Sequence, residues 1–187
     1  MKKTLFSLAL VALFSVANLT TISAQKAKTV MVGGAAMYPT KNIVENAMNS
    51  KDHTTLVAAV KAAGLVETLE SAGPFTVFAP TNEAFNKLPK GTVETLLKPE
   101  NKATLTKILT YHVVAGRMTS ADLVKAIKAG KGKATLKTVS GGTLTAMMKG
   151  KAIELKDEKG GISTVTIANV MQSNGVIHVV NAVLLPM

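Results

Sequence analysis

Residues 73–88 read GPFTVFAPTNEAFNKL, a stretch in which two prolines enclose a short run rich in β-forming residues. Proline has no backbone N–H and disfavours helix at the residue before it, so Pro74 and Pro80 predict a strand over residues 75–79. A Thr-Asn pair directly after Pro80 can cap a following helix. The apolar residues of this stretch that we expect to fill the core are Phe75, Val77 and Phe85.

The rest of the chain divides into an earlier helical part and a later β-rich part. Apolar spacing and capping residues predict helices over 52–64, 65–70, 92–97, 100–109 and 121–129, with Asp52 and Thr119 as N-caps. Alternating or β-branched runs predict strands at 111–114, 133–139, 143–148, 151–156, 162–168 and 175–185. Glycine-rich turns between the later runs favour antiparallel hairpins, and the last run is apolar enough to be covered on both sides. This order predicts an α+β domain.

The N-terminus has the form of an export signal. Two Lys near the start precede the apolar run Leu5–Ala17, and Ile22-Ser23-Ala24 offers a small residue before a cleavage point. The run is too short to cross about 30 Å of hydrocarbon, which needs roughly 20 residues. We expect cleavage after Ala24 and secretion of the remainder, into the periplasm or outside the cell. We interpret residues 25–41 as a flexible leader and residues 42–187 as one domain.

Composition excludes several classes of protein. Lys and Arg number 22 against 11 Asp and Glu, a net charge of +11, yet Arg117 is the single arginine. One Arg, no Trp and seven other aromatic residues argue against specific recognition of nucleic acids. The absence of Cys excludes disulfides and thiolate chemistry. The three His are far apart in sequence, and neither a serine-nucleophile motif nor a phosphate-binding loop is found. We therefore predict no metal, no cofactor and no enzymatic activity.

Three segments together resemble the signatures of the fasciclin (beta-Ig-H3/fasciclin) domain. They are GPFTVFAPTNEAFNKL at 73–88, LTYHVV at 109–114 and SNGVIHVVNAVLLP at 173–186, in the order of that family. The resemblance implies a fasciclin-like wedge-shaped β-sandwich with helices packed along one side and end. It also implies membership of a family of secreted or surface-displayed adhesion and matrix modules. The chain looks like the single-domain bacterial form.

The resemblance points to two candidate binding segments. In animal relatives the Tyr-His segment is linked to integrin-type cell adhesion, and Leu109, Tyr111, His112, Val113 and Val114 match it here. The other interpretation is structural: buried Tyr and His side chains satisfy each other or nearby backbone groups. Adhesive relatives also carry an Asp-Ile pair where this chain has Asn169 and Val170. The missing carboxylate disfavours an integrin-type metal contact.

Two functions remain open on the sequence alone. The first is a non-enzymatic adhesion module that binds a cell-surface or matrix protein or polysaccharide. Two interpretations of the many lysines in the second half of the chain are open: they attract anionic polymers, as this function requires, or they only keep the protein soluble. These lysines are Lys125, Lys128, Lys131, Lys133, Lys137, Lys149, Lys151, Lys156 and Lys159. The second is a binding protein for a hydrophobic small molecule such as a lipid or carotenoid. Met147, Met148 and Met171 then line an adaptable groove, unless they are ordinary core residues.

Overall fold

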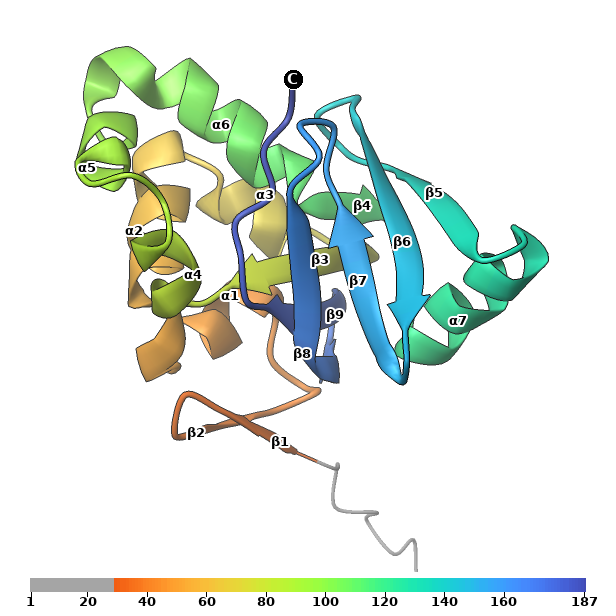
Figure 1. Cartoon of the computed structure of the whole chain (residues 1–187). Coiled ribbons are helices and arrows are strands. Elements are labelled where there is room, and N and C mark those ends of the chain that lie inside the picture. Colours follow the sequence, from red (N-terminus) through yellow and green to blue (C-terminus); the bar gives the residue numbers. More distant parts are fainter. Residues whose placement is uncertain (1–28) are drawn as a thin grey trace, which may run out of the picture.

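The computed structural model describes residues 29–187. Its main feature is a strongly curved seven-stranded sheet in the order β4-β3-β9-β8-β7-β6-β5 (Figure 1). These strands are β3 (Phe75–Pro80), β4 (Val113–Ala115), β5 (Lys133–Lys137), β6 (Thr143–Lys149), β7 (Ala152–Lys156), β8 (Ile162–Gln172) and β9 (Gly175–Val180). The predicted export signal lies outside the described residues.

The sheet curls until its two edge strands meet. β3 and β9 run parallel, and every other neighbouring pair in the sheet is antiparallel, as predicted for the later strands. One isolated bridge joins Val114 of the edge strand β4 to Thr138, the residue directly after the other edge strand, β5. The sheet is therefore almost closed into a barrel, and the predicted α+β class is confirmed.

Helices pack mostly on one side of this sheet (Figure 1). On that side lie α1 (Ile43–Ala47), α2 (Thr54–Ala63), α3 (Val66–Glu70), α4 (Asn82–Asn86), α5 (Thr92–Leu96) and α6 (Lys102–Tyr111), with short 3-10 turns at Lys51–His53 and Pro99–Asn101. Helix α7 (Ser120–Ala129) packs against β5 and β6 at the other end. None of the helices within residues 29–187 combines the length and apolar character that crossing a membrane requires.

Two details of the helices differ from the sequence prediction. Asp52 lies in a 3-10 turn and does not cap α2; instead Asn82 Oδ1 accepts hydrogen bonds from Thr55 N (3.0 Å) and Thr54 Oγ1 (3.2 Å). Tyr111, predicted to begin a strand, is the last residue of α6, and β4 begins two residues later. Both differences arise from tertiary contacts, which override local propensity.

The segment expected to be a flexible leader is ordered where it is described. Strands β1 (Val30–Val32) and β2 (Ala35–Met37) form a separate antiparallel hairpin. Val32 and Met37 are each only 3% exposed and belong to the core under the helices. Lys51 N donates to Gly33 O (3.2 Å), and a Cβ at Gly33 would overlap the Ser50 side chain. The ordered domain therefore begins before residue 42. The sequence did not predict this hairpin, because strands of three residues are too short to show an alternating pattern.

Strand β3 is buried on both faces, because helices cover one face and the curled sheet covers the other. Val77 and Phe85 lie in the core as predicted, whereas Phe75 is only partly buried. Phe78, which the sequence did not single out, is completely buried and stacks on the ring of His178 at a centroid distance of 5.7 Å.

We predict that Phe78→Ala lowers the free energy of unfolding by about 3–5 kcal/mol, the usual cost of truncating a fully buried aromatic side chain. Phe75→Ala is the matched control and should cost clearly less, because Phe75 keeps part of its surface in water. Urea unfolding of the two variants beside the parent chain measures both losses. Equal losses would contradict the burial described for the two rings.

Candidate functional site

Tyr111 joins the helical side of the molecule to the sheet. Its ring is fully buried at the end of α6. The hydroxyl donates to Thr143 O (2.6 Å) and accepts from Glu158 N (3.1 Å). Burial raises the pKa of Tyr111 to about 12, although the hydrogen bond from Glu158 works against this shift. A Cβ at Gly142 would lie 2.8 Å from the ring, so the turn before β6 also fits closely around Tyr111.

His112 makes a second buried connection directly beside Tyr111. Its Nδ1 lies 2.8 Å from Ile108 O, so this nitrogen carries the proton and donates it. Nε2 is then free to accept from Leu184 N (3.0 Å). Burial lowers the pKa of His112 to about 4, so the ring is neutral at pH 7. The two side chains bond to backbone groups and not to each other, a geometry that fits the structural interpretation of this pair.

The other residues of the Tyr-His segment are also inside the molecule. Leu109 and Val113 belong to the core under the helices, and Val114 belongs to the core inside the curled sheet. Each of these side chains is less than a tenth exposed. A binding partner of the folded protein therefore meets little of this segment, and its predicted role in binding stays a prediction.

Asn169 and Val170 lie on β8, which the two strands β3 and β9 separate from β4. Val170 is buried. Asn169 has a left-handed backbone (φ 60), which Asn tolerates better than most residues. Its Oδ1 accepts from Ser120 N (2.7 Å), and its Nδ2 donates to Ser120 Oγ (2.7 Å). The Asn169 side-chain amide thus holds the start of α7 through two hydrogen bonds, one that its oxygen accepts and one that its nitrogen donates. The structure does not bring this pair into one surface with the Tyr-His segment.

The other two histidines are buried as well. His178 Nε2 donates to Met118 O (2.8 Å), and His53 Nδ1 lies 2.8 Å from Ser50 Oγ. His53 Nε2 has no hydrogen-bond partner among residues 29–187, and the ring lines an internal space of about 10 Å³ together with Val32 and Met37. Burial lowers the pKa of both rings. No three His, Asp or Glu side chains of the described part of the chain are placed to hold a metal ion.

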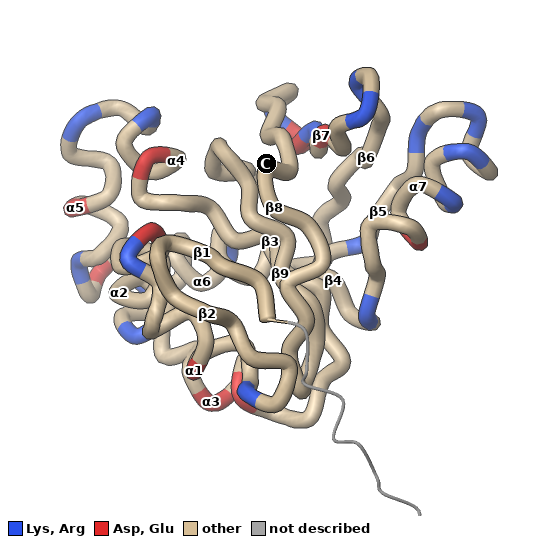
Figure 2. The backbone as a smooth tube through the Cα atoms, turned by 90° about the horizontal axis from the view of Figure 1, so that it is seen from below, with Lys and Arg blue, Asp and Glu red and all other residues tan. Residues whose placement is uncertain are grey.

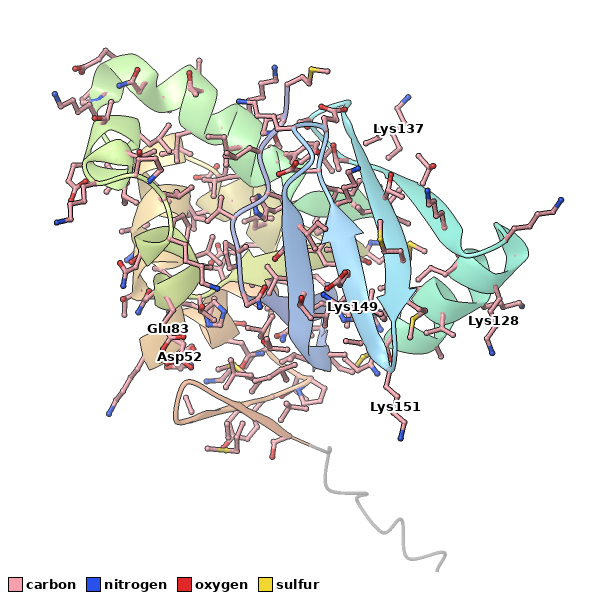
Figure 3. All side chains as sticks on the ribbon, in the orientation of Figure 1. Asp52, Glu83, Lys128, Lys137, Lys149 and Lys151 are labelled. Atoms are coloured by element: carbon pink, nitrogen blue, oxygen red, sulfur yellow. The ribbon has the colours of Figure 1, made fainter. Side chains whose placement is uncertain are left out.

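Surface charge is concentrated in one part of the molecule. We define the lysine-rich lobe as residues 120–160, which comprise α7, β5, β6, β7 and their turns. It contains nine Lys and four acidic residues, whereas residues 41–111 contain eight Lys and seven acidic residues. Figure 2 shows the lobe's basic residues on α7, beside β5 and on the turns next to β6 and β7. In Figure 3 the side chains of Lys128, Lys137 and Lys151 extend away from the lobe.

The acidic residues of the lobe offset less than half of its lysine charge and leave a formal net charge of +5. Glu154 and Asp157 are buried. Asp122 accepts from Thr119 in the capping box of α7, and Glu158 accepts from the Thr143 and Met187 amides. Within residues 29–187 the one ion pair joins Lys149 to Glu154 (3.3 Å). The other lysines of the lobe therefore carry charge without an ion-pair partner in the described chain.

A cavity of about 70 Å³ lies between the helices α2, α3 and α6 and the sheet. Its lining is almost entirely apolar and includes Val57, Leu65, Phe75, Leu109 and Ile177. Lys61, Thr68 and Val139 are the exposed members of the lining and mark where it opens. The sequence gives no sign of this cavity, because its walls come from many separate elements. The three methionines proposed to line a groove are instead on β6 and β8, outside this cavity.

We predict that the free energy of unfolding falls as the pH drops from about 6.5 to about 4. His112 stays neutral in the folded protein down to about pH 4, whereas in the unfolded chain it binds a proton near pH 6.5. The unfolded state thus holds more protons in this window, and acid favours it. His112 alone accounts for about 3 kcal/mol, at about 1.4 kcal/mol per pKa unit.

Urea unfolding followed by circular dichroism between pH 8 and pH 4 measures this dependence. His53 and His178 act in the same direction, because burial also lowers their pKa values. The His112→Asn variant should lose part of the pH dependence. An unchanged pH dependence in that variant would show that His112 is not the group that titrates.

Comparison with known proteins identifies the family. The family model of the fasciclin domain matches residues 51–186. Protein sll1483 of Synechocystis sp. is 48% identical over 163 residues, which cover 85% of this chain and 81% of that protein. The immunogenic protein MPB70 of Mycobacterium bovis is 37% identical over 145 residues, or 75% of this chain and 66% of that protein.

The fold agrees with this assignment. A solved FAS1 domain pair from the insect cell adhesion molecule fasciclin I matches with a TM-score of 0.70 and 19% identity, over 79% of this chain and 52% of that one. At this identity the likeness concerns the fold alone, and it confirms the fold that the three sequence segments imply. The chain therefore belongs to the fasciclin-domain family.

Proposed function

We propose that the chain is a secreted, non-enzymatic interaction module that binds anionic polymers of a cell surface or extracellular matrix. The observation that carries the proposal is the composition of the lysine-rich lobe. It contains nine Lys and only four acidic residues, and those four are buried or hydrogen-bonded within the protein. Membership of a family with adhesion proteins among its members supports an interaction role. In this proposal the Tyr-His segment contributes by holding α6 against the sheet.

The chemistry of lysine sets the character of the binding. A lysine ammonium group is compact, strongly hydrated and not shaped for bidentate recognition. The lysines of the lobe also stand on several elements and do not converge on one pocket. Binding should therefore be spread over the lobe and weakened by salt, since the Debye length shrinks to a few ångströms as ionic strength approaches 1 M.

We predict that the protein is retained on an immobilised acidic polysaccharide at low salt and is released at about 0.5 M salt. Replacing Lys125, Lys128, Lys131 and Lys137 together by Gln should weaken retention by roughly fourfold or more, because each exposed charge pair contributes roughly 0.2–1 kcal/mol. The matched control replaces four exposed lysines of the helical side by Gln: Lys61, Lys90, Lys98 and Lys102. It removes the same charge and should retain most of the binding.

Each outcome of this experiment has a distinct meaning. Equal weakening in the two variants would show that only the net charge matters and would contradict a binding role of the lobe. Absence of retention at low salt would contradict the anionic-polymer proposal itself. Retention that survives 0.5 M salt would contradict diffuse binding and require a shaped site.

The apolar cavity supports a second candidate function, the binding of a hydrophobic small molecule. Its lining offers almost no polar group to a ligand, as expected for an apolar site. Its volume of about 70 Å³ is well below the roughly 300–1,000 Å³ of drug-sized ligand pockets. A whole lipid or carotenoid therefore does not fit, whereas part of an alkyl chain does. Lys61 at the opening suits a carboxylate head group.

For this second candidate we predict that octanoate at ten times its Kd raises the Tm by about 3–5 °C, from mass-action stabilisation of the folded state. Val57→Phe, which fills the cavity from α2, should abolish the shift. Differential scanning calorimetry of both proteins with and without octanoate is the measurement. An equal shift in the Val57→Phe variant would place octanoate elsewhere and contradict this candidate.

A further inference from the structure

We propose that the free edge of β5 binds an extended acidic peptide segment, which adds to the sheet as a further strand. This inference rests on the proposed function as an interaction module and names one partner of the lysine-rich lobe. It starts from an open groove of about 480 Å³ between β4, β5 and α7. The groove is lined by residues that include Val114, Ala115, Met118, Ala126, Thr135 and Lys137.

The groove exists because the curled sheet does not close fully. Within residues 29–187 one isolated bridge joins the two edges, between Val114 of β4 and Thr138, the residue directly after β5. Val139 N donates to Val113 O (2.8 Å) at the same place. Towards the start of β5 no further pairing joins the two edges within the described residues, and Met118 and Ala126 line the space between them. The edge of β5 is thus left without a neighbouring strand over most of its length.

Backbone alternation shows which groups of β5 face the groove. Thr138 N donates to Gly142 O (2.9 Å) on the β6 side, whereas the next amide, Val139 N, donates to the β4 side. Backbone N–H groups alternate between the two edges of a strand. The amides of Thr135 and Lys137 therefore point to the β4 side, where the groove lies. These two donors are available to the backbone of an added strand.

Side chains on β5 indicate which peptide would fit. Ala134 and Leu136 are buried, whereas Lys133, Thr135 and Lys137 are exposed. An added strand would place alternate residues beside the two lysines, where acidic side chains are favoured, because opposite charges on neighbouring strands attract. Its other residues would face the apolar wall formed by Met118 and Ala126. The expected partner therefore alternates acidic and apolar residues.

The same charges disfavour a second copy of this chain as the occupant. Two β5 edges placed side by side would bring lysines against lysines, and like charges across a strand pair are destabilising. Lysines on an exposed edge strand are also a common protection against self-association. An acidic strand from another protein meets neither obstacle. Backbone pairing would supply affinity and the lysines would supply selectivity, as in other cases of strand addition.

The test uses the full chain and a synthetic peptide, acetylated and amidated, of six alternating Val and Glu residues. Its matched control is the same peptide N-methylated at every internal residue, which keeps the charge and removes the backbone donors. Amide hydrogen exchange followed by NMR reports on individual residues of β5. We expect the unmodified peptide to slow exchange of the Thr135 and Lys137 amides at least tenfold at saturation, and the N-methylated peptide to leave both unchanged.

Three variants separate the backbone contact from charge. Thr135→Pro removes one donor at an edge position, where proline is tolerated, and Thr135→Val keeps that donor. Ala126→Leu narrows the groove without altering β5. We expect the Pro and Leu variants to bind the unmodified peptide at least tenfold more weakly, and the Val variant to bind it as the parent chain does. The Leu variant keeps the test decisive if Thr135→Pro does not fold.

The outcomes distinguish this inference from the proposal on which it rests. Equal binding of the two peptides, without slower exchange at Thr135 and Lys137, would overturn strand addition and leave charge attraction as the explanation. Retention on acidic polysaccharide without any peptide binding would also overturn it, and Lys133 and Lys137 would then serve only to protect the edge. Failure of both the peptide and the polysaccharide to bind would contradict the inference and the proposed function together.

Discussion

The parallel pairing of β3 with β9 is the contact on which the rest of the fold depends. The two strands align from Phe75 beside Gly175 to Pro80 beside Val180, although about 100 residues separate them in the chain. The backbones approach so closely that a Cβ at Gly175 would overlap the carbonyl oxygen of Phe75. Helices cover one face of the pair and the curled sheet covers the other. Both strands are therefore apolar without alternation.

This pairing explains which parts of the sequence carry the family resemblance. The first and last of the three segments contain β3 and β9, and the Tyr-His segment lies where α6 meets β4. Tyr111 and His112 hold that junction by hydrogen bonds to the backbone of Thr143, Glu158, Ile108 and Leu184. The recognisable residues thus build the frame. The proposed contact surface belongs to the lobe beyond them.

Patterns among neighbouring residues predicted much of the fold. The features that they did not predict depend on contacts between residues far apart in the sequence. Thr119 forms the expected cap of α7, because a capping box needs only neighbouring residues. Asn82, which caps α2 from about 27 residues further along the chain, has no such local signature. The sequence pattern predicts a strand at Tyr111. In the structure Tyr111 is the last residue of α6, and its hydroxyl group donates a hydrogen bond to the backbone of Thr143. The candidate surfaces divide in the same way: the lysine excess is visible in the sequence, whereas the groove and the cavity exist only after distant elements meet.

The β1–β2 hairpin is a small sheet separate from the seven-stranded one. It is anchored by Val32, Met37 and the Lys51–Gly33 hydrogen bond, and within the described residues it pairs with no strand of the seven-stranded ladder. Local opening of such a unit would break no hydrogen bond of that ladder. Lifting it uncovers the internal space that His53 shares with Val32 and Met37. His53 Nε2, which has no hydrogen-bond partner within residues 29–187, borders that space. Among the described residues the hairpin is therefore a layer over His53 that lies outside the main sheet, so access to this ring from that side depends on the hairpin and not on the central strands.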